Sequence, residues 1–143
     1  MNTVLVGVDG SDSSRRAMAF ACERARQLDL ELLVVHVIPW SPYSFNTPTE
    51  NEHRHAQKQF EIEAAQEQVV SPACALAEEA GVPVEGVVRH GDPVDLLLDL
   101  AKGKEVSHIV VGRTGDSRMR RVVFGSTPGH LVQLAPVPVT VVP

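Results

Sequence analysis

The sequence is poor in cysteine, in aromatic residues and in long apolar runs. Its 143 residues include only two cysteines, one tryptophan, one tyrosine and four phenylalanines. Cys22 and Cys74 form neither a C-x-x-C pair nor a cluster with histidines at zinc-ligand spacing, which argues against a disulfide framework or a zinc knuckle. No apolar run approaches the roughly 18 residues of a membrane span, and the N-terminus lacks the basic and apolar regions of a signal peptide. We therefore expect a cytoplasmic protein without membrane insertion.

Positive charge is also scarce. Thirteen Lys and Arg residues stand against eighteen Asp and Glu residues, which gives a net charge of −5. A chain with this balance lacks the general basic surface of a nucleic-acid binder, so we expect no nucleic-acid partner. Hydrophobic residues make up 43% and charged residues 22% of the chain, as in an ordinary globular protein. The length predicts one domain, spanning residues 1–143.

Short apolar runs alternate with stretches that repeat apolar residues at helical spacing. Unbroken apolar runs are typical of strands buried on both faces of a sheet. Five such runs lie at residues 4–8, 32–38, 82–89, 106–111 and 137–142. Helices are predicted from an N-cap in 11–14 to residue 28, and over residues 49–80, 94–101 and 128–135. This alternation predicts a single doubly wound α/β domain, with a parallel sheet and helices on both faces.

Prolines predict two irregularities in this pattern. Pro72 should kink or split the long second helix, because proline removes a hydrogen bond and crowds the preceding turn. Residues 39–48 contain three prolines together with Trp40, Tyr43 and Phe45. We expect this segment to be a long irregular connection.

The segment after the fourth predicted strand is rich in glycine and arginine. Gly112, Gly115 and Gly125 follow the spacing Gly-x2-Gly-x9-Gly, and Ser126 and Thr127 come directly before a predicted helix. Glycines let the main chain approach a ligand closely, and the unpaired N–H groups at a helix start favour an anion. Residues 112–125 carry a charge of +3, while the rest of the chain carries −8. The pattern predicts a phosphate site.

Three other families of α/β proteins do not fit these residues. The chain has no G-x-x-x-x-G-K-[ST] motif and no G-x-G-x-x-G after its first strand, so neither a Walker NTPase nor a Rossmann dehydrogenase is supported. A phospho-acceptor receiver domain is also unsupported. The third predicted strand ends in Arg89, His90 and Gly91 instead of an acceptor aspartate, and no lysine follows the fifth strand.

The glycine spacing, continued by Ser126, resembles the nucleotide-binding signature of the universal stress protein family, in its ATP-binding branch. The resemblance covers nearly the whole chain, with further landmarks at residues 6–11, 35–37, 91–93, 110–112 and 138–142. It implies five parallel strands in the order 3-2-1-4-5. It also implies an adenine nucleotide in the crevice at the carboxyl ends of strands one and four, where the strand order reverses.

The resemblance implies roles for individual residues. Asp9, next to Val8, would reach the ribose or the adenine, and the main chain of Val37 would meet the adenine edge. The phosphates would be held by Gly112, Arg113, Gly115, Gly125, Ser126 and Thr127. ATP is the ligand that the family implies, with AMP or ADP as alternatives and Mg²⁺ as a candidate companion. Two positions depart from the family pattern. Pro128 has no N–H to donate, and Arg113-Thr114 stands where Ser-Arg or Ser-His is common.

Simpler interpretations stay open for several of these residues. Asp9 could serve only as a cap of the first helix, a role that Ser11 and Asp12 could also fill. The segment 112–125 could be a long turn with a solvated basic rim. His36 is more simply explained as a packed histidine than as a ligand contact, and Cys22 and Cys74 as small buried apolar residues.

The function predicted from these residues is that of a regulatory or stress-response protein for which the nucleotide is a ligand. Efficient hydrolysis is not expected, because no water-activating base, Walker lysine or pair of metal carboxylates stands near the phosphates. The alternative is a slow ATPase or nucleotidyl-transfer enzyme that uses Asp9 for Mg²⁺ and His130 or an arginine at the phosphates. A ligand-free interaction module is a further alternative.

The last predicted strand suggests a homodimer. In the strand order that the family implies, the strand from Val137 to Val142 forms an edge of the sheet, where main-chain groups have no partner strand. Val139, Val141 and Val142 are apolar and β-branched, and no charged residue occurs in 131–143. We expect two copies to pair through this strand. We also expect a regulatory protein partner, which the sequence does not identify.

Overall fold

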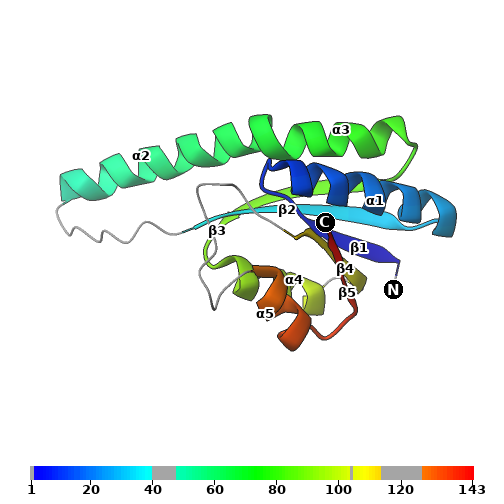
Figure 1. Ribbon diagram of the computed structural model, residues 1–143. Coiled ribbons are helices and arrows are strands. Elements are labelled where there is room, and N and C mark those ends of the chain that lie inside the picture. The colour runs from blue at the N-terminus through cyan, green and yellow to red at the C-terminus, as the bar shows by residue number, and fades with distance from the viewer. Residues whose placement is uncertain (1, 40–47, 104, 114–126) are drawn as a thin grey trace.

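Five parallel strands form one sheet at the centre of the computed structural model (Figure 1). The structure describes residues 2–39, 48–103, 105–113 and 127–143. The strands are β1 (Thr3–Gly7), β2 (Glu31–Ile38), β3 (Val84–His90), β4 (Val106–Gly112) and β5 (Val139–Val142). Their order is β3-β2-β1-β4-β5, which confirms the predicted topology. The order reverses between β1 and β4.

Helices cover both faces of this sheet, as predicted (Figure 1). One face carries α1 (Asp12–Leu28), α2 (Pro48–Ala65), the π-helical turn η1 (Gln66–Val70) and α3 (Ser71–Glu79). The other face carries α4 (Pro93–Gly103) and α5 (Thr127–Leu134). No helix in the described part of the chain combines the length and the apolar content needed to cross a bilayer.

Side chains of the strands alternate between two buried clusters, one on each face. Along β1, Val4 and Val6 join the cluster beneath α1 and α3, whereas Leu5 joins the cluster beneath α4 and α5. Leu5 and Val6 are both 0% exposed. Because each face of β1 is covered, polar residues have no place on it, and this explains why the strand reads as an unbroken apolar run.

The third strand begins later than the sequence predicts. Gly81 has a positive φ of 74°, and the Val82 N–H donates to the Ala77 carbonyl at 2.9 Å, which closes the end of α3. Val82 is buried although it precedes β3. The prediction that the strand starts at Val82 was therefore wrong, because burial in the helix-to-strand turn looks like strand burial in the sequence.

The predicted break at Pro72 is absorbed by a local widening of the helix. The Ser71 N–H donates to the Gln66 carbonyl, five residues back, so the turn before Pro72 is π-helical. Proline has no N–H and would crowd the carbonyl four residues before it in a regular α-helix. The widened turn lets the chain stay helical, and α2 and α3 run on as nearly one rod in Figure 1.

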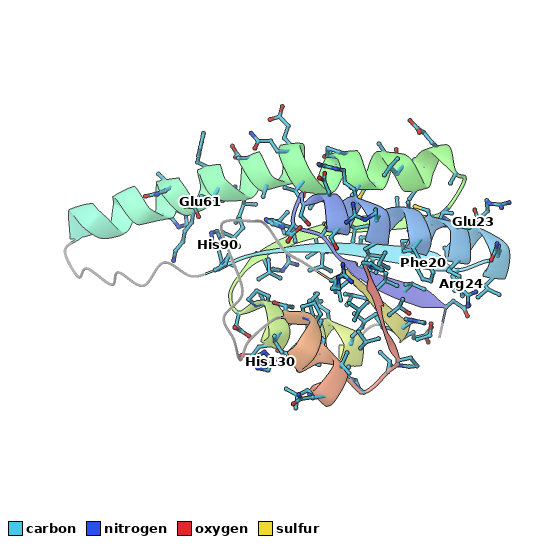
Figure 2. The ribbon with its side chains drawn as sticks, viewed as in Figure 1. Phe20, Glu23, Arg24, Glu61, His90 and His130 are labelled. Carbon is cyan, nitrogen blue, oxygen red and sulfur yellow. The ribbon has the colours of Figure 1, made fainter. Side chains whose placement is uncertain are left out.

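Two contacts bring this rod close to β3. His90 at the end of β3 lies 3.0 Å from Glu61 of α2, measured from Nε2 to Oε2, and the His90 side chain is only 7% exposed (Figure 2). Further along, Gly86 of β3 lies under η1 and α3. A Cβ atom at Gly86 would lie 2.5 Å from Cγ1 of Val70 and 3.0 Å from Sγ of Cys74. The missing side chain at Gly86 thus permits the close approach of helix and strand.

We predict that Gly86→Ala lowers the free energy of unfolding by about 1–3 kcal/mol, because the added methyl group overpacks the contact with Val70. Gly103→Ala is the matched control, since a Cβ atom there meets nothing within 4 Å. Urea unfolding measures both. A Gly86→Ala protein as stable as the control would show that the helix can move away at no cost.

His108 of β4 is half-buried against β5. Its Nε2 lies 2.5 Å from Oγ1 of Thr140. Burial, and secondly the positive charge of Arg24, lower the pKa of His108 below its ordinary value of 6.5. Between pH 6.5 and that lower folded pKa, the unfolded chain binds a proton here that the folded chain does not. The stability that depends on the neutral ring is therefore lost as the pH falls.

His108→Gln should flatten this pH dependence. We expect the free energy of unfolding of wild type to fall more between about pH 7 and pH 5 than that of the variant. Urea titrations at several pH values measure the difference. His55→Gln, at an exposed position of α2, is the control. Parallel curves for wild type and His108→Gln would contradict the role of His108.

Candidate functional site

The carboxyl ends of β1 and β4 lie side by side at the reversal of strand order. Gly7, the last residue of β1, pairs with Val111 of β4 and with Val35 of β2. Val8 follows Gly7, and Gly112, the last residue of β4, follows Val111. The chain therefore leaves the two strands at the same edge of the sheet. In a doubly wound sheet the following helices cover opposite faces, which makes room for a ligand between the loops.

Asp9 is held firmly at the end of β1. Its Oδ1 accepts the Ser11 N–H at 2.9 Å, and its own main-chain N–H donates to Oγ of Ser14 at 3.0 Å. Gly10 adopts a positive φ of 80°, which permits the tight turn between them. Ser11 is the N-cap of α1, since its side chain accepts the Ser14 N–H at 3.1 Å. Asp9 therefore orders the turn before α1 and is not itself the cap.

The end of β2 is tied to the same place. Val8 donates its N–H to the Val35 carbonyl at 2.9 Å, and Nδ1 of His36 lies 2.7 Å from the Val8 carbonyl oxygen. His36 thus does more than pack, which the sequence did not reveal. The main-chain groups of successive residues in β2 point alternately toward β1 and toward β3. The Val35 carbonyl faces β1, whereas the Ile38 carbonyl accepts the N–H of Gly91, the residue after β3. Val37 consequently directs its main-chain groups toward the β1 side, at a level where β1 has ended.

Gly112 is in direct contact with the first turn of α1. A Cβ atom at Gly112 would lie 2.5 Å from Oγ of Ser13, and 2.8 Å and 2.9 Å from its carbonyl carbon and oxygen. Ser13 is 2% exposed. The sequence assigned Gly112 to phosphate binding alone, whereas the structure gives it a packing role between β4 and α1.

Arg113 is joined to β5 through its main chain. Its N–H donates to the Val142 carbonyl at 2.7 Å, and Oγ of Ser13 donates to the same carbonyl at 3.2 Å. The Arg113 amide is thus committed to the sheet, which leaves the guanidinium as the part of this residue able to meet a phosphate. Three segments, namely the end of β4, the end of β5 and the first turn of α1, meet at Ser13.

The phosphate side is described only in part. Thr127 is the first residue of α5, one position before the predicted start, and Pro128 follows in the first turn, where a missing N–H is tolerated. Gly115, Gly125 and Ser126 lie outside the described residues, as do residues 40–47. Among the side chains that the structure describes, no three His, Cys, Asp or Glu residues gather closely enough to hold a metal ion.

We predict that Gly112→Ala destabilises the fold by about 1–3 kcal/mol, and that Ser13→Ala in the same chain does not restore the loss. The reason is that the new methyl group meets main-chain atoms of Ser13 as well as its hydroxyl. Urea unfolding of the two single variants and the double variant provides the test. Full recovery in the double variant would mean that the hydroxyl alone sets the constraint.

Comparison with known proteins agrees with this geometry. The model of the universal stress protein family matches residues 1–143. Universal stress protein YxiE of Bacillus subtilis is 32% identical over 145 residues, which cover 99% of this chain and 98% of the relative.

Two solved structures share the fold over nearly their full length. Universal stress protein UspA from Lactobacillus plantarum is 26% identical, with a TM-score of 0.75 over 99% of this chain and 97% of the other. A universal stress protein in complex with cAMP is 27% identical, with a TM-score of 0.69 over 99% and 95% of the two chains. The chain described here belongs to the universal stress protein family.

Proposed function

We propose that this protein binds an adenine nucleotide at the carboxyl ends of β1 and β4, and that ATP is its ligand, with AMP or ADP as alternatives. The observation that carries the proposal is the Asp9 carboxylate, fixed by the Ser11 N–H at the end of β1, the strand that pairs with β4, whose last residue Gly112 begins the glycine spacing. The relative solved with cAMP shares the fold over 99% of this chain, which supports the choice of an adenine nucleotide.

The base and the sugar belong on the β1 and β2 side of this site. A carboxylate accepts hydrogen bonds from ribose hydroxyls or from an adenine amino group, and Asp9 is held in place for that role by the turn before α1. Val37 supports the assignment of the adenine edge, because its main-chain N–H and C=O point to the side where β1 has ended. Val8 supplies the apolar neighbour.

The phosphates belong on the β4 and α5 side. Gly112, Gly115, Gly125 and Ser126 form the sequence signature, and Thr127 begins α5, whose N-terminus favours an anion. The arginines of this segment give it a charge of +3 in an otherwise acidic chain. A triphosphate would thus meet positive charge and main-chain donors together.

The nucleotide acts as an effector in this proposal. Its binding biases conformation or partner choice in a cytoplasmic stress response, and hydrolysis is slow or absent. The sequence offers no Walker lysine and no evident base to activate water near the phosphates, which supports this view. The regulatory partner is a second protein.

Calorimetry with ATP and adenosine tests the site. We expect Asp9→Ala to weaken ATP and adenosine by similar factors, because the carboxylate acts on the part that the two ligands share. Gly125→Val should weaken ATP by about 5- to 150-fold and adenosine much less, since a lost phosphate contact is worth about 1–3 kcal/mol. Asp99→Ala, at an exposed position of α4, is the control.

Three outcomes would each contradict a part of the proposal. Wild-type affinity in both site variants, with the fold intact by circular dichroism, would move the nucleotide elsewhere. An Asp9→Ala protein that loses affinity for ATP only would place the carboxylate at the phosphates. Steady turnover of Mg-ATP by the pure protein, abolished by Asp9→Ala, would favour a slow ATPase over an effector site.

We also propose that the protein is a homodimer that pairs through β5. This strand is an edge of the sheet, and all four of its side chains are half-buried. No charged residue occurs in 131–143. An edge strand without charges to repel another strand is suited to pairing with a second copy.

A further inference from the structure

The hydrogen bonds between β1 and β2 end before β2 does. The two strands pair in parallel up to Gly7 and Val35, and the last bond runs from the Val8 N–H to the Val35 carbonyl at 2.9 Å. β2 continues to Ile38. In an unbroken parallel pair the next bond would join the Val37 N–H to the Val8 carbonyl.

A side chain takes the place of that bond. Nδ1 of His36 lies 2.7 Å from the Val8 carbonyl oxygen. A carbonyl oxygen can only accept, so Nδ1 carries the proton and donates. Among the residues that the structure describes, no main-chain hydrogen bond joins Val37 to Val8. His36 thus occupies the acceptor that the Val37 N–H would otherwise use.

The turn after β1 explains why the two strands part here. The Asp9 N–H donates to Oγ of Ser14 in the first turn of α1 at 3.0 Å, so the chain turns toward this helix. His36 lies on the same face of the sheet, because Val34, two positions before it, packs in the cluster beneath α1. The imidazole is therefore on the side toward which the chain turns at Val8.

Pairing with β3 does not use the main chain of Val37 either. The Leu32 N–H donates to the Pro83 carbonyl, and the Ile38 carbonyl accepts the Gly91 N–H. Even-numbered positions of β2 therefore bond toward β3. Because main-chain direction alternates along a strand, the N–H and the carbonyl of Val37 face the β1 side. This edge of β2 presents one donor next to one acceptor, beyond the last bond to β1.

A donor next to an acceptor distinguishes between purine bases. The adenine edge offers N1 as an acceptor and the 6-amino group as a donor, which match the N–H and the carbonyl of Val37. In hypoxanthine the same two positions carry an N–H and a carbonyl oxygen, so donor would face donor and acceptor would face acceptor. A site discriminates against a ligand that leaves its polar groups unpaired. Discrimination of this kind requires an available Val37 N–H.

We propose that His36 is a positioning residue that sets the base preference of the nucleotide site. By holding the Val8 carbonyl, it keeps the Val37 N–H available to N1 of adenine and does not itself touch the ligand. The inference rests on the proposed nucleotide site and adds the residue that makes the main chain of β2 selective.

Removal of the imidazole should restore the missing main-chain bond. Val8 is 6% exposed, and a buried carbonyl without a partner is costly. In His36→Leu the donor that a parallel pair would supply is the Val37 N–H. We expect the pairing of β1 with β2 to extend by this one bond, which withdraws the donor from the base.

Amide hydrogen exchange, followed by NMR, tests this step without any ligand. In wild type we expect the Val37 amide to exchange faster than the amide of Val35, which is paired with β1. In His36→Leu the Val37 amide should become protected. His36→Asn should behave as wild type, since Nδ2 of asparagine is as many bonds from the main chain as Nδ1 of histidine. Equal protection of Val37 in wild type and His36→Leu would overturn the displaced bond.

Calorimetry with ATP and inosine triphosphate (ITP) tests the consequence for binding. The two ligands differ only at the edge of the base. We expect wild type to bind ATP at least about 10-fold more tightly than ITP. His36→Leu should weaken ATP by about 5- to 150-fold and ITP much less, so that the preference falls. His36→Asn should keep the preference.

His108→Leu is the matched control. It also removes a contact of a half-buried imidazole, here with Oγ1 of Thr140. His108 pairs with Val4 near the start of β1, away from the carboxyl ends of the strands. The variant should lower the stability of the fold and leave the ratio of the ATP and ITP affinities unchanged. A general loss of stability is thereby separated from a change in base preference.

The outcomes separate this inference from the proposed function. Wild type that binds ATP and ITP equally, or His36→Leu that keeps the preference for ATP, overturns the role of His36 and leaves the nucleotide site standing. Loss of the preference in His36→Asn as well would place the imidazole against the ligand and overturn a positioning role. Wild type that binds neither ligand overturns the proposed function and base selection together, whereas exchange of the Val37 amide still decides whether His36 displaces this N–H. Both wild-type measurements stand even where His36→Leu does not fold.

Discussion

The close packing of the first turn of α1 on the ends of β4 and β5 sets the geometry of the candidate site and of the end of β5. Gly112 has room for Ser13 only because it has no side chain, and Oγ of Ser13 bonds to the Val142 carbonyl that the Arg113 N–H also reaches. The turn that orders Asp9 leads directly into this helix. A shift of α1 along the sheet would therefore disturb the Asp9 turn and the end of β5 together.

Apolar periodicity predicted the fold because both faces of the sheet are covered. The strand order itself came from the family resemblance and is confirmed by the structure. An error arose where burial and local conformation do not coincide, because Val82 is buried in a turn before β3. The predicted split at Pro72 is present, but as a π-helical turn between α2 and α3. Neither outcome can be predicted from composition or spacing, since each depends on the atoms that surround Val82 and Pro72 in the folded chain.

The candidate site was predicted as a set of residues but not as a set of contacts. Glycine spacing identified Gly112, and the family resemblance identified Asp9 at the end of the first strand. The packing of Gly112 on Ser13 joins residues far apart in the sequence, and the contact of His36 with the Val8 carbonyl needs the register of β1 against β2. Contacts of this kind follow from tertiary structure, so a single sequence carries no signal for them.

The two edges of the sheet differ in chemistry, and this difference bears on how far the proposed homodimer could assemble. An open sheet with two receptive edges can add copies without end, and the product is a filament. Here Glu85 and Arg89 are exposed on β3, whereas no charged residue occurs in 131–143, the stretch that contains β5. In the proposed homodimer, pairing about a two-fold axis would use the β5 edge of both copies at once, so assembly would stop at a closed particle whose β3 edges remain in water.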